Sequence, residues 1–331
     1  MISGWRTADG RDPSLIPKLK GRTLILKDFT EVLDSHRSTR DEIYSIMRGA
    51  YDGSVEKVYG NGVRRIYPEV HFSVVAGVTQ KIYAERSASL GERFLMLHIV
   101  KGNQHEGAED IILRALENVG TDNLIAAELA AVAHKYLAYG LSEEELAEAY
   151  ESCNGEIDRR IANLAQLVGM LRGQVDRDYR SGGLLYRAQY ELGTRLAKQL
   201  KKLAIALAVL EDPVEINASV YRAIVRVALD TCIGFNREIV EALIIRPKQD
   251  IMSLNEITGI PVTTLRERLD DMLELEIVCR GGIPNPRGLG APAYLYSLSQ
   301  KTETLWTKAG LSENDIVPES LQRVDAGRKR R

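Results

Sequence analysis

Cysteine is scarce in this sequence and is not clustered. Cys153, Cys232 and Cys279 are the three cysteines among 331 residues, and no two of them form a CxxC pair. This number and spacing argue against a disulfide framework and against a zinc site. They fit a reducing compartment, and we expect the protein to be cytoplasmic.

Long apolar runs and an excess of one charge are also missing. No window of about 18 residues is apolar and free of charge, and the N-terminus lacks the apolar core of a signal peptide. The formal net charge is -2, which gives no overall attraction to nucleic acid or to an anionic membrane. We therefore expect no membrane partner, and any nucleic-acid binding should be local.

Several catalytic signatures are absent. The five histidines have neither HxxxH nor HExxH spacing, and no serine or cysteine lies in a GxSxG pattern. The chain also contains no GxxxxGK[ST] motif, whose backbone amides and lysine bind nucleotide phosphates. Metal-dependent hydrolysis of the HExxH type and acyl transfer are therefore unsupported.

The apolar pattern divides the chain into successive regions. Residues 1–104 are predicted to be α/β, with strands at 23–26 and 71–78, a helix at 40–51 and a hairpin about Gly60-Asn61-Gly62. The two strands are nearly continuous in apolar character, which predicts a sheet covered on both faces. The length of the chain allows two or three domains.

The rest of the chain is predicted to be mainly helical. Residues 105–235 form a helical domain, with a capping box at Ser142 and Glu145 and long helices at 156–171 and 191–209. Residues 236–310 have the order of a winged helix-turn-helix, namely three helices, a strand, a glycine-rich loop, a strand and a helix. Residues 311–331 are polar, end in GRKRR and are expected to be disordered.

Polar residues follow both predicted strands of the first region. Asp28 comes after the strand at 23–26, and Thr79 and Gln80 come at the end of the strand at 71–78. Open α/β sheets bind ligands beyond the carboxyl ends of their strands. An aspartate there can hold Mg²⁺, and a neighbouring polar side chain can orient a phosphate or a water. Taken alone, this motif favours a solvated acid in a turn, because four apolar residues followed by an acid recur in many globular proteins.

With these residues and the GERF sequence around Arg93, residues 22–99 resemble the second half of an AAA+ ATPase core. The resemblance assigns Asp28 to the Walker B position and Thr79 to sensor 1, with an inserted β-hairpin between them. It assigns Arg93 to the arginine finger, with Arg86 as a second choice. Helicase-like ATPases of phages and mobile elements are the most similar. The resemblance implies ATP and Mg²⁺ as cofactors, with Asp28 as the Mg²⁺ ligand, and a homo-oligomer such as a hexameric ring.

The helical region extends this resemblance. AAA+ proteins carry a sensor 2 arginine on a lid helix, and Arg195 occupies that place here. A guanidinium group donates paired hydrogen bonds to phosphate oxygens and stays charged at any working pH. The alternative is an exposed helical arginine that has no function.

Two departures bear on catalysis. Phe29 follows Asp28 where the family has a glutamate, so the acid that polarises water is either Glu31, two residues further on, or missing. The absent phosphate-binding loop removes most of the contacts to the phosphates. We therefore expect negligible ATP hydrolysis by this chain alone. It is either the C-terminal part of a longer ATPase or a degenerate AAA+ protein retained as a scaffold.

The predicted winged helix is the second candidate site, and DNA is its expected partner. Its second helix carries acidic residues that would repel phosphates if they faced the same way. A protein-docking or packing role is the alternative, and the whole chain is then a non-enzymatic DNA-binding regulator or an inactive adaptor for a partner ATPase. The candidate DNA-binding residues are Thr263, Thr264, Arg266 and Arg268 of the recognition helix, and Arg280 and Arg287 of the wing.

Overall fold

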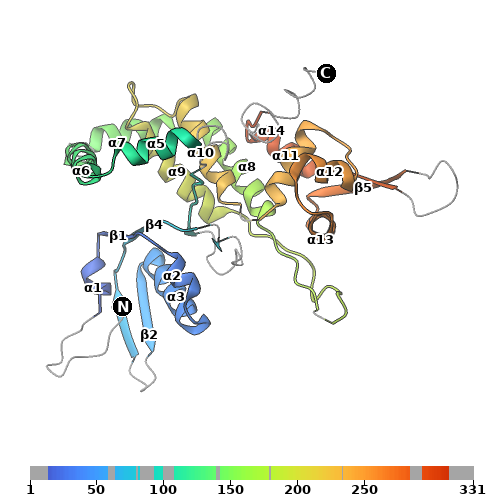
Figure 1. Ribbon diagram of the computed structural model, residues 1–331, viewed down its shortest axis with the longest axis horizontal. Helices are drawn as coiled ribbons and strands as arrows, with labels where there is room; N and C mark the ends of the chain where they lie inside the picture. The colour runs from blue at the N-terminus through green and yellow to red at the C-terminus, as the bar shows by residue number, and fades with distance from the viewer. Residues whose placement is uncertain are drawn as a thin grey trace. The chain divides into compact units, whose positions relative to one another are not determined.

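The computed structural model describes residues 14–58, 64–79, 81–82, 93–99, 108–138, 142–178, 180–232, 234–283 and 293–312. It is a mixed α/β structure made mostly of helices with small two-stranded sheets (Figure 1). The chain divides into two compact units, Met1–Phe94 and Leu95–Arg331. The mixed α/β class predicted from the sequence is confirmed. The boundary between the units lies between Phe94 and Leu95, whereas the sequence analysis ended the first region at residue 104.

The first unit contains a parallel pair of strands. After the short helix α1 (Ile16–Leu19), β1 (Thr23–Leu26) pairs with β4 (Ser73–Ala76), and Leu26 lies opposite Ala76. The pairing continues past the strands, because the Phe29 amide donates to the Gly77 carbonyl at 2.7 Å. Both strands therefore end at the same edge.

Two helices and a hairpin connect these strands. They are α2 (Thr30–Asp34), α3 (Arg37–Asp52) and the antiparallel pair β2 (Ser54–Val58) and β3 (Arg64–Pro68). Gly53 ends α3 in the left-handed region at φ 92°, where an added Cβ would meet the His71 ring at 2.6 Å. The predicted hairpin is confirmed, although its tip at 59–63 lies outside the described residues.

The core of the first unit covers only one face of the parallel sheet. A small cluster that includes Ile46, Val55 and Tyr67 is buried. Ile25 and Val75, which are register partners in β1 and β4, are 70% and 60% exposed. Within the first unit, the prediction of a sheet covered on both faces is therefore wrong for the described residues, because none of the unit's described elements packs on the Ile25 side.

The second unit begins with an all-helical region. Gly193 at the start of α9 and Gly169 in α8 allow these two helices to approach, since a Cβ on either glycine would lie within 2.5 Å of a backbone oxygen. The predicted capping box at Ser142 and Glu145 is confirmed. The helices are α5 (Ala108–Glu117), α6 (Asp122–Ala138), α7 (Glu143–Ser152), α8 (Gly155–Leu171), α9 (Thr194–Ala208) and α10 (Ala218–Asp230).

The C-terminal region follows the predicted order of three helices, two strands and a helix. The antiparallel pair places Arg280 opposite Tyr296. This region shares one continuous hydrophobic core with α8, α9 and α10, in which Leu164, Leu200 and Leu265 are fully buried. The elements are α11 (Asn236–Ile245), α12 (Ile251–Thr258), α13 (Val262–Glu274), β5 (Val278–Ile283), β6 (Ala293–Leu298) and α14 (Gln300–Lys308).

The described helices include none that is both long enough and apolar enough to cross a membrane. The predicted disordered tail, from residue 313 onward, lies outside the described residues.

Candidate functional site

The parallel sheet brings Asp28 and Thr79 to one edge. Asp28 follows β1 and Thr79 follows β4, and Thr30 connects the two segments. The Thr30 and Thr79 hydroxyl oxygens are 3.2 Å apart, and the Thr30 amide donates to Asp28 Oδ1 at 2.8 Å. The Thr79 amide also donates to the Thr30 hydroxyl at 3.5 Å. One carboxylate and two hydroxyl groups therefore gather at this strand edge.

The Asp28 carboxylate is exposed and charged. Hydrogen bonds from the side chain and backbone of Thr30 hold the pKa of Asp28 below its ordinary value. Anionic and neutral oxygen ligands are those that Mg²⁺ prefers, and protein Mg²⁺ sites commonly use only one or two carboxylates together with substrate phosphates. In the described residues no group of three or more histidine, cysteine or acidic side chains could hold a metal by itself. The oxygen donors at this edge thus fit a Mg²⁺ ion that also binds phosphate.

Phe29 explains why the residue after Asp28 is not an acid. Its side chain is 5% exposed and stacks on Tyr44, with 6.3 Å between ring centroids. A charged side chain in that position would be buried without a partner, which is strongly unfavourable. Glu31, the alternative acid, lies exposed in the first turn of α2. Glu31 is thus the first exposed acid after Asp28 in the sequence.

Arg93 is held within the first unit. Its guanidinium pairs with Asp52 at 2.8 Å and lies over the Tyr51 ring, 5.8 Å from the centroid, with 12% of the side chain exposed. Asp52 is the last residue of α3, where the helix dipole also favours a cation. An arginine in this position must leave Asp52 before it can reach another molecule. Arg86, Gln80, Gly91 and Glu92 lie outside the described residues.

Arg195, the predicted sensor 2 residue, lies in the second unit. It is exposed in the first turn of α9, two residues after the buried Gly193. The structure therefore presents a solvent-facing guanidinium on a helix of the second unit, whereas Asp28 belongs to the first unit.

The predicted DNA-binding residues lie on α13 and β5. Thr263, Arg266 and Arg268 are exposed and Thr264 is half-buried, whereas Leu265, Leu269 and Met272 anchor the opposite side of α13 in the core. Arg280 lies over the Tyr294 ring, with 4.5 Å to the centroid. Arg287 lies outside the described residues.

Arg177 neutralises one of the α13 acids, and the sequence did not single it out. It lies in the segment between α8 and α9, and its Nε donates to Asp271 Oδ1 at 3.0 Å. Arg268 approaches the same carboxylate at 3.8 Å. The abundance of arginine in DRDYRSGG was the one available signal, and it does not reveal a partner 94 positions away.

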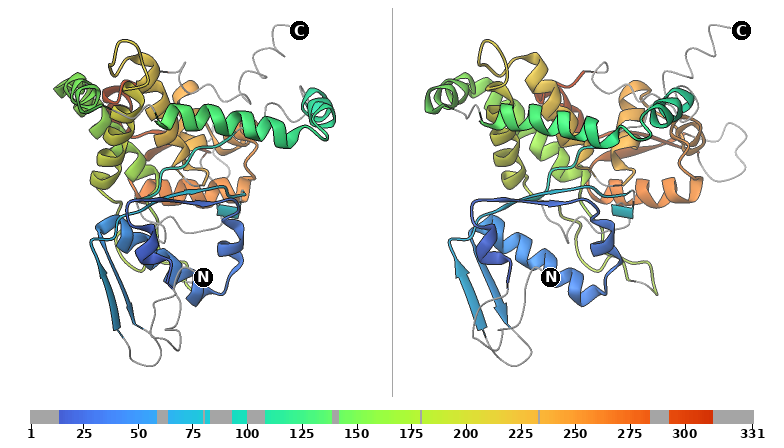
Figure 2. Two further views of the ribbon diagram at one scale, coloured as in Figure 1. Left: turned by 90° about the vertical axis from the view of Figure 1, so that its left-hand side faces the viewer. Right: turned by 60° about the vertical axis from the view of Figure 1, so that its left-hand side comes forward.

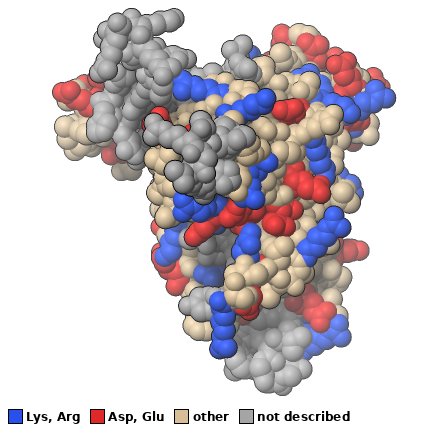
Figure 3. Space-filling model, turned by 90° about the vertical axis from the view of Figure 1, so that its right-hand side faces the viewer, with Lys and Arg blue, Asp and Glu red and all other residues tan. Residues whose placement is uncertain are grey.

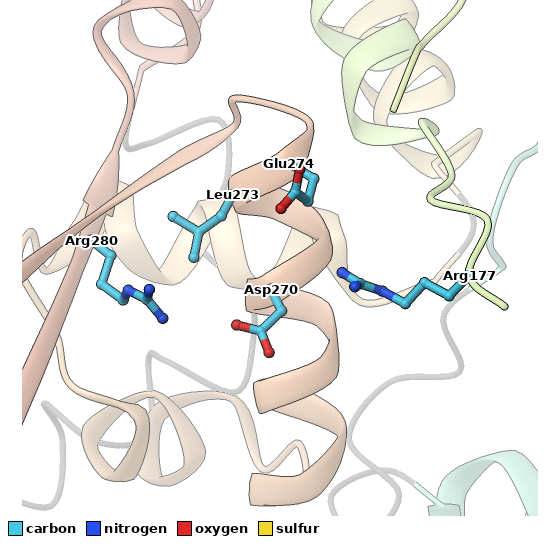
Figure 4. A pocket seen from close by; sticks show the side chains of 5 residues that line it. All are labelled: Arg177, Asp270, Leu273, Glu274 and Arg280. Atoms are coloured by element: carbon cyan, nitrogen blue, oxygen red, sulfur yellow. The ribbon is translucent and has the colours of Figure 1, made fainter. Parts of the chain in front are cut away.

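A pocket of about 410 Å³ opens between this segment, α13 and β5. Figure 4 shows the Arg177 and Arg280 side chains on opposite sides of α13, with Asp270 between them. Figure 3 shows lysines and arginines interspersed with acidic side chains rather than gathered in one basic patch. The pocket therefore has mixed charge. Its lining residues are Arg177, Asp270, Leu273, Glu274 and Arg280.

No family model, curated protein or solved structure matches this chain.

Proposed function

We propose that this chain supplies the Walker B and sensor 1 side of an ATP site in an AAA+ ATPase of helicase-like type that acts on DNA. The observation that carries the proposal is the meeting of Asp28 and Thr79 at the carboxyl edge of two parallel strands, connected through Thr30. Strand ends of this kind are where open α/β sheets bind ligands.

The residues have distinct roles in this proposal. Asp28 holds Mg²⁺ directly or through water, since its carboxylate is exposed and charged. Bound Mg²⁺ supplies positive charge to the phosphate oxygens. The Thr79 hydroxyl orients the γ-phosphate or the attacking water, and Thr30 fixes its position. The chain lacks a GxxxxGK[ST] motif, and the acid that polarises water is either Glu31 or missing, so we expect negligible hydrolysis by the chain alone.

The C-terminal region is proposed to be a winged helix-turn-helix that binds DNA. Support comes from its element order, from the exposed Thr263 and Arg266 on α13, and from Arg280 on the first strand of the wing. Arg177 lowers the repulsion between α13 and phosphates by pairing with Asp271. Mixed charge on this surface favours weak binding with little sequence preference.

Binding of a fluorescent ATP analogue tests the nucleotide site. With the full chain we expect weak binding, with a Kd on the order of 1 mM, that requires Mg²⁺. Asp28→Asn should abolish the Mg²⁺-dependent binding while keeping the turn, because an amide oxygen can still accept from the Thr30 amide. Asp41→Asn is the matched control, an exposed acid on α3 away from the strand edge. Equal Mg²⁺-dependent binding by Asp28→Asn would refute the assignment.

Duplex DNA binding by the full chain and by its arginine variants tests the proposed winged helix-turn-helix. Arg280→Ala should weaken binding to every sequence and reduce the slope of the salt dependence by about one unit, as expected for one lost phosphate contact. Tight, sequence-selective binding that is lost only in Arg266→Ala would favour the regulator over the ATPase.

A further inference from the structure

Helices α5 and α6 expose apolar side chains, and on α6 these are spread around the whole helix. Every described side chain of both helices is exposed, which contrasts with the helices around them. Leu116 on α5 and Leu129 on α6 are 62% and 66% exposed. Figure 2 shows α5 in teal and α6 in green. A helix that is apolar around its circumference is normally buried, because packing supplies most helical stability. Among the residues that the structure describes, these helices therefore have no element packed over their apolar side chains.

One line along α6 has the spacing of a coiled-coil seam. Ile125, Leu129 and Val132 are separated by four and then three residues, as in the a and d positions of a heptad. All three lie on one side of the helix and are 36%, 66% and 67% exposed. This seam is ready to pack against another helix.

The residues beside the seam indicate which helix fits. On one side are Ala126 and Ala133, whose small side chains allow close approach of a second backbone. On the other side are Glu128 and Lys135, one heptad apart. Both charged side chains are exposed, and neither has an ion-pair partner among the residues that the structure describes. The α6 surface thus carries opposite charges at equivalent heptad positions.

We propose that a second copy of this chain docks on α6 in antiparallel orientation. With Leu129 facing Val132 of the partner subunit, Glu128 falls beside Lys135 of the partner subunit. Ala126 and Ala133 then lie beside the same two alanines of the partner subunit. In a two-fold pair each of these contacts occurs twice. A parallel pair would instead place Glu128 beside an alanine, so the charges select the antiparallel arrangement.

The antiparallel α6 pair differs from the subunit contact that a hexameric ring would use. A two-fold pair uses the same surface on both copies, whereas a ring through Arg93 would use two different surfaces. The pair is independent of the proposed ATPase function. Since α6 has 17 residues and a length of about 25 Å, the buried area is small and association should be weak, with a Kd in the range of roughly 1 to 100 µM.

Sedimentation velocity of the full chain over about 1 to 200 µM tests the proposal. We expect a reversible monomer–dimer equilibrium. Either Glu128→Lys or Lys135→Glu alone should weaken dimerisation about tenfold or more, because both cross-pairs become like-charged. The double variant E128K/K135E should restore it, since the pairs are re-formed with reversed polarity. Restoration requires that the variants fold, which makes the swap independent of any folding defect.

Leu129→Glu and Leu124→Glu form the second test. Both leucines lie on α6 and are equally exposed, at 66% and 65%, but only Leu129 is on the seam. Leu129→Glu should abolish the dimer, whereas Leu124→Glu should leave it within about threefold of wild type. A wild-type chain that stays monomeric throughout would overturn the proposal. So would an assembly that ignores both charge reversals, because another surface would then hold it.

Discussion

The two units bury their apolar residues to very different extents. In the first unit the core is a small cluster, and the parallel sheet leaves Ile25 and Val75 exposed on one face. In the second unit a single core runs from α8 through α14 and includes Leu200 and Met272 with no exposed surface. Hydrophobic stabilisation grows with the apolar area removed from water, so the second unit should be the more stable one. A two-stranded sheet is rarely stable without further cover.

Truncation of a core side chain should give the largest loss in the free energy of unfolding, and it tests the difference between the two units. Leu200→Ala removes a fully buried side chain, and we expect a loss of about 2 to 5 kcal/mol in the free energy of unfolding. Leu192→Ala, with 75% exposure, is the matched control, and Ile25→Ala is the equivalent change in the first unit. Both should remain within about 0.5 kcal/mol of wild type.

Tryptophan fluorescence can report the second unit in these variants. Trp306 is 4% exposed in α14, and Trp5 is the second tryptophan of the chain, so a Trp5→Phe background isolates the signal. Urea unfolding followed by Trp306 gives the free energy of unfolding for the two second-unit variants, and hydrogen exchange of residues 14–58 gives the value for Ile25→Ala. A cost for Ile25→Ala as large as that for Leu200→Ala would mean that the exposed sheet face is covered in solution.

The contact between α8 and α9 should give an intermediate effect. Gly193 has φ 69°, and an added Cβ would lie 2.4 Å from the Ala165 carbonyl oxygen. Gly193→Ala must therefore strain the backbone and move the helices apart, with an expected loss of about 1 to 3 kcal/mol. Gly155→Ala is the control, because a Cβ added to Gly155 would meet nothing within 4 Å. Equal urea midpoints for the two variants would contradict this account of the helix contact.

Titration of His98, near the start of the second unit, should have the smallest effect on the free energy of unfolding. The His98 amide donates to Asp230 at 2.9 Å. Burial lowers the pKa of His98 below its usual 6.5, although the charge of Asp230 opposes the shift and Arg237 and Arg226 support it. The unfolded chain therefore binds this proton at higher pH than the folded chain, so stability is lost as pH falls through about 6.5.

Urea midpoints at about pH 7.5 and 5.5 measure this effect. The wild-type midpoint should fall more between these two pH values than the midpoint of His98→Gln, which cannot titrate. An equal fall in both proteins would show that other groups account for the pH dependence.

Local structure was largely predictable from the sequence. The strand at 23–26, the hairpin and the capping box at Ser142 appear where they were predicted. The meeting of Asp28 and Thr79 was predictable too, since parallel strands present their carboxyl ends at one edge. Thr30, the residue that connects them, was missed because a threonine in a turn carries no distinctive pattern.

The sequence by itself determined the positions of turns, caps and strand ends, because these depend on the φ preferences and hydrogen bonds of neighbouring residues. Only the tertiary structure decided which face of the sheet is covered, that Arg93 pairs with Asp52 and that Arg177 reaches Asp271. These outcomes depend on packing between segments far apart in the chain, and the identity of a single charged residue does not reveal which partner packing will bring to it.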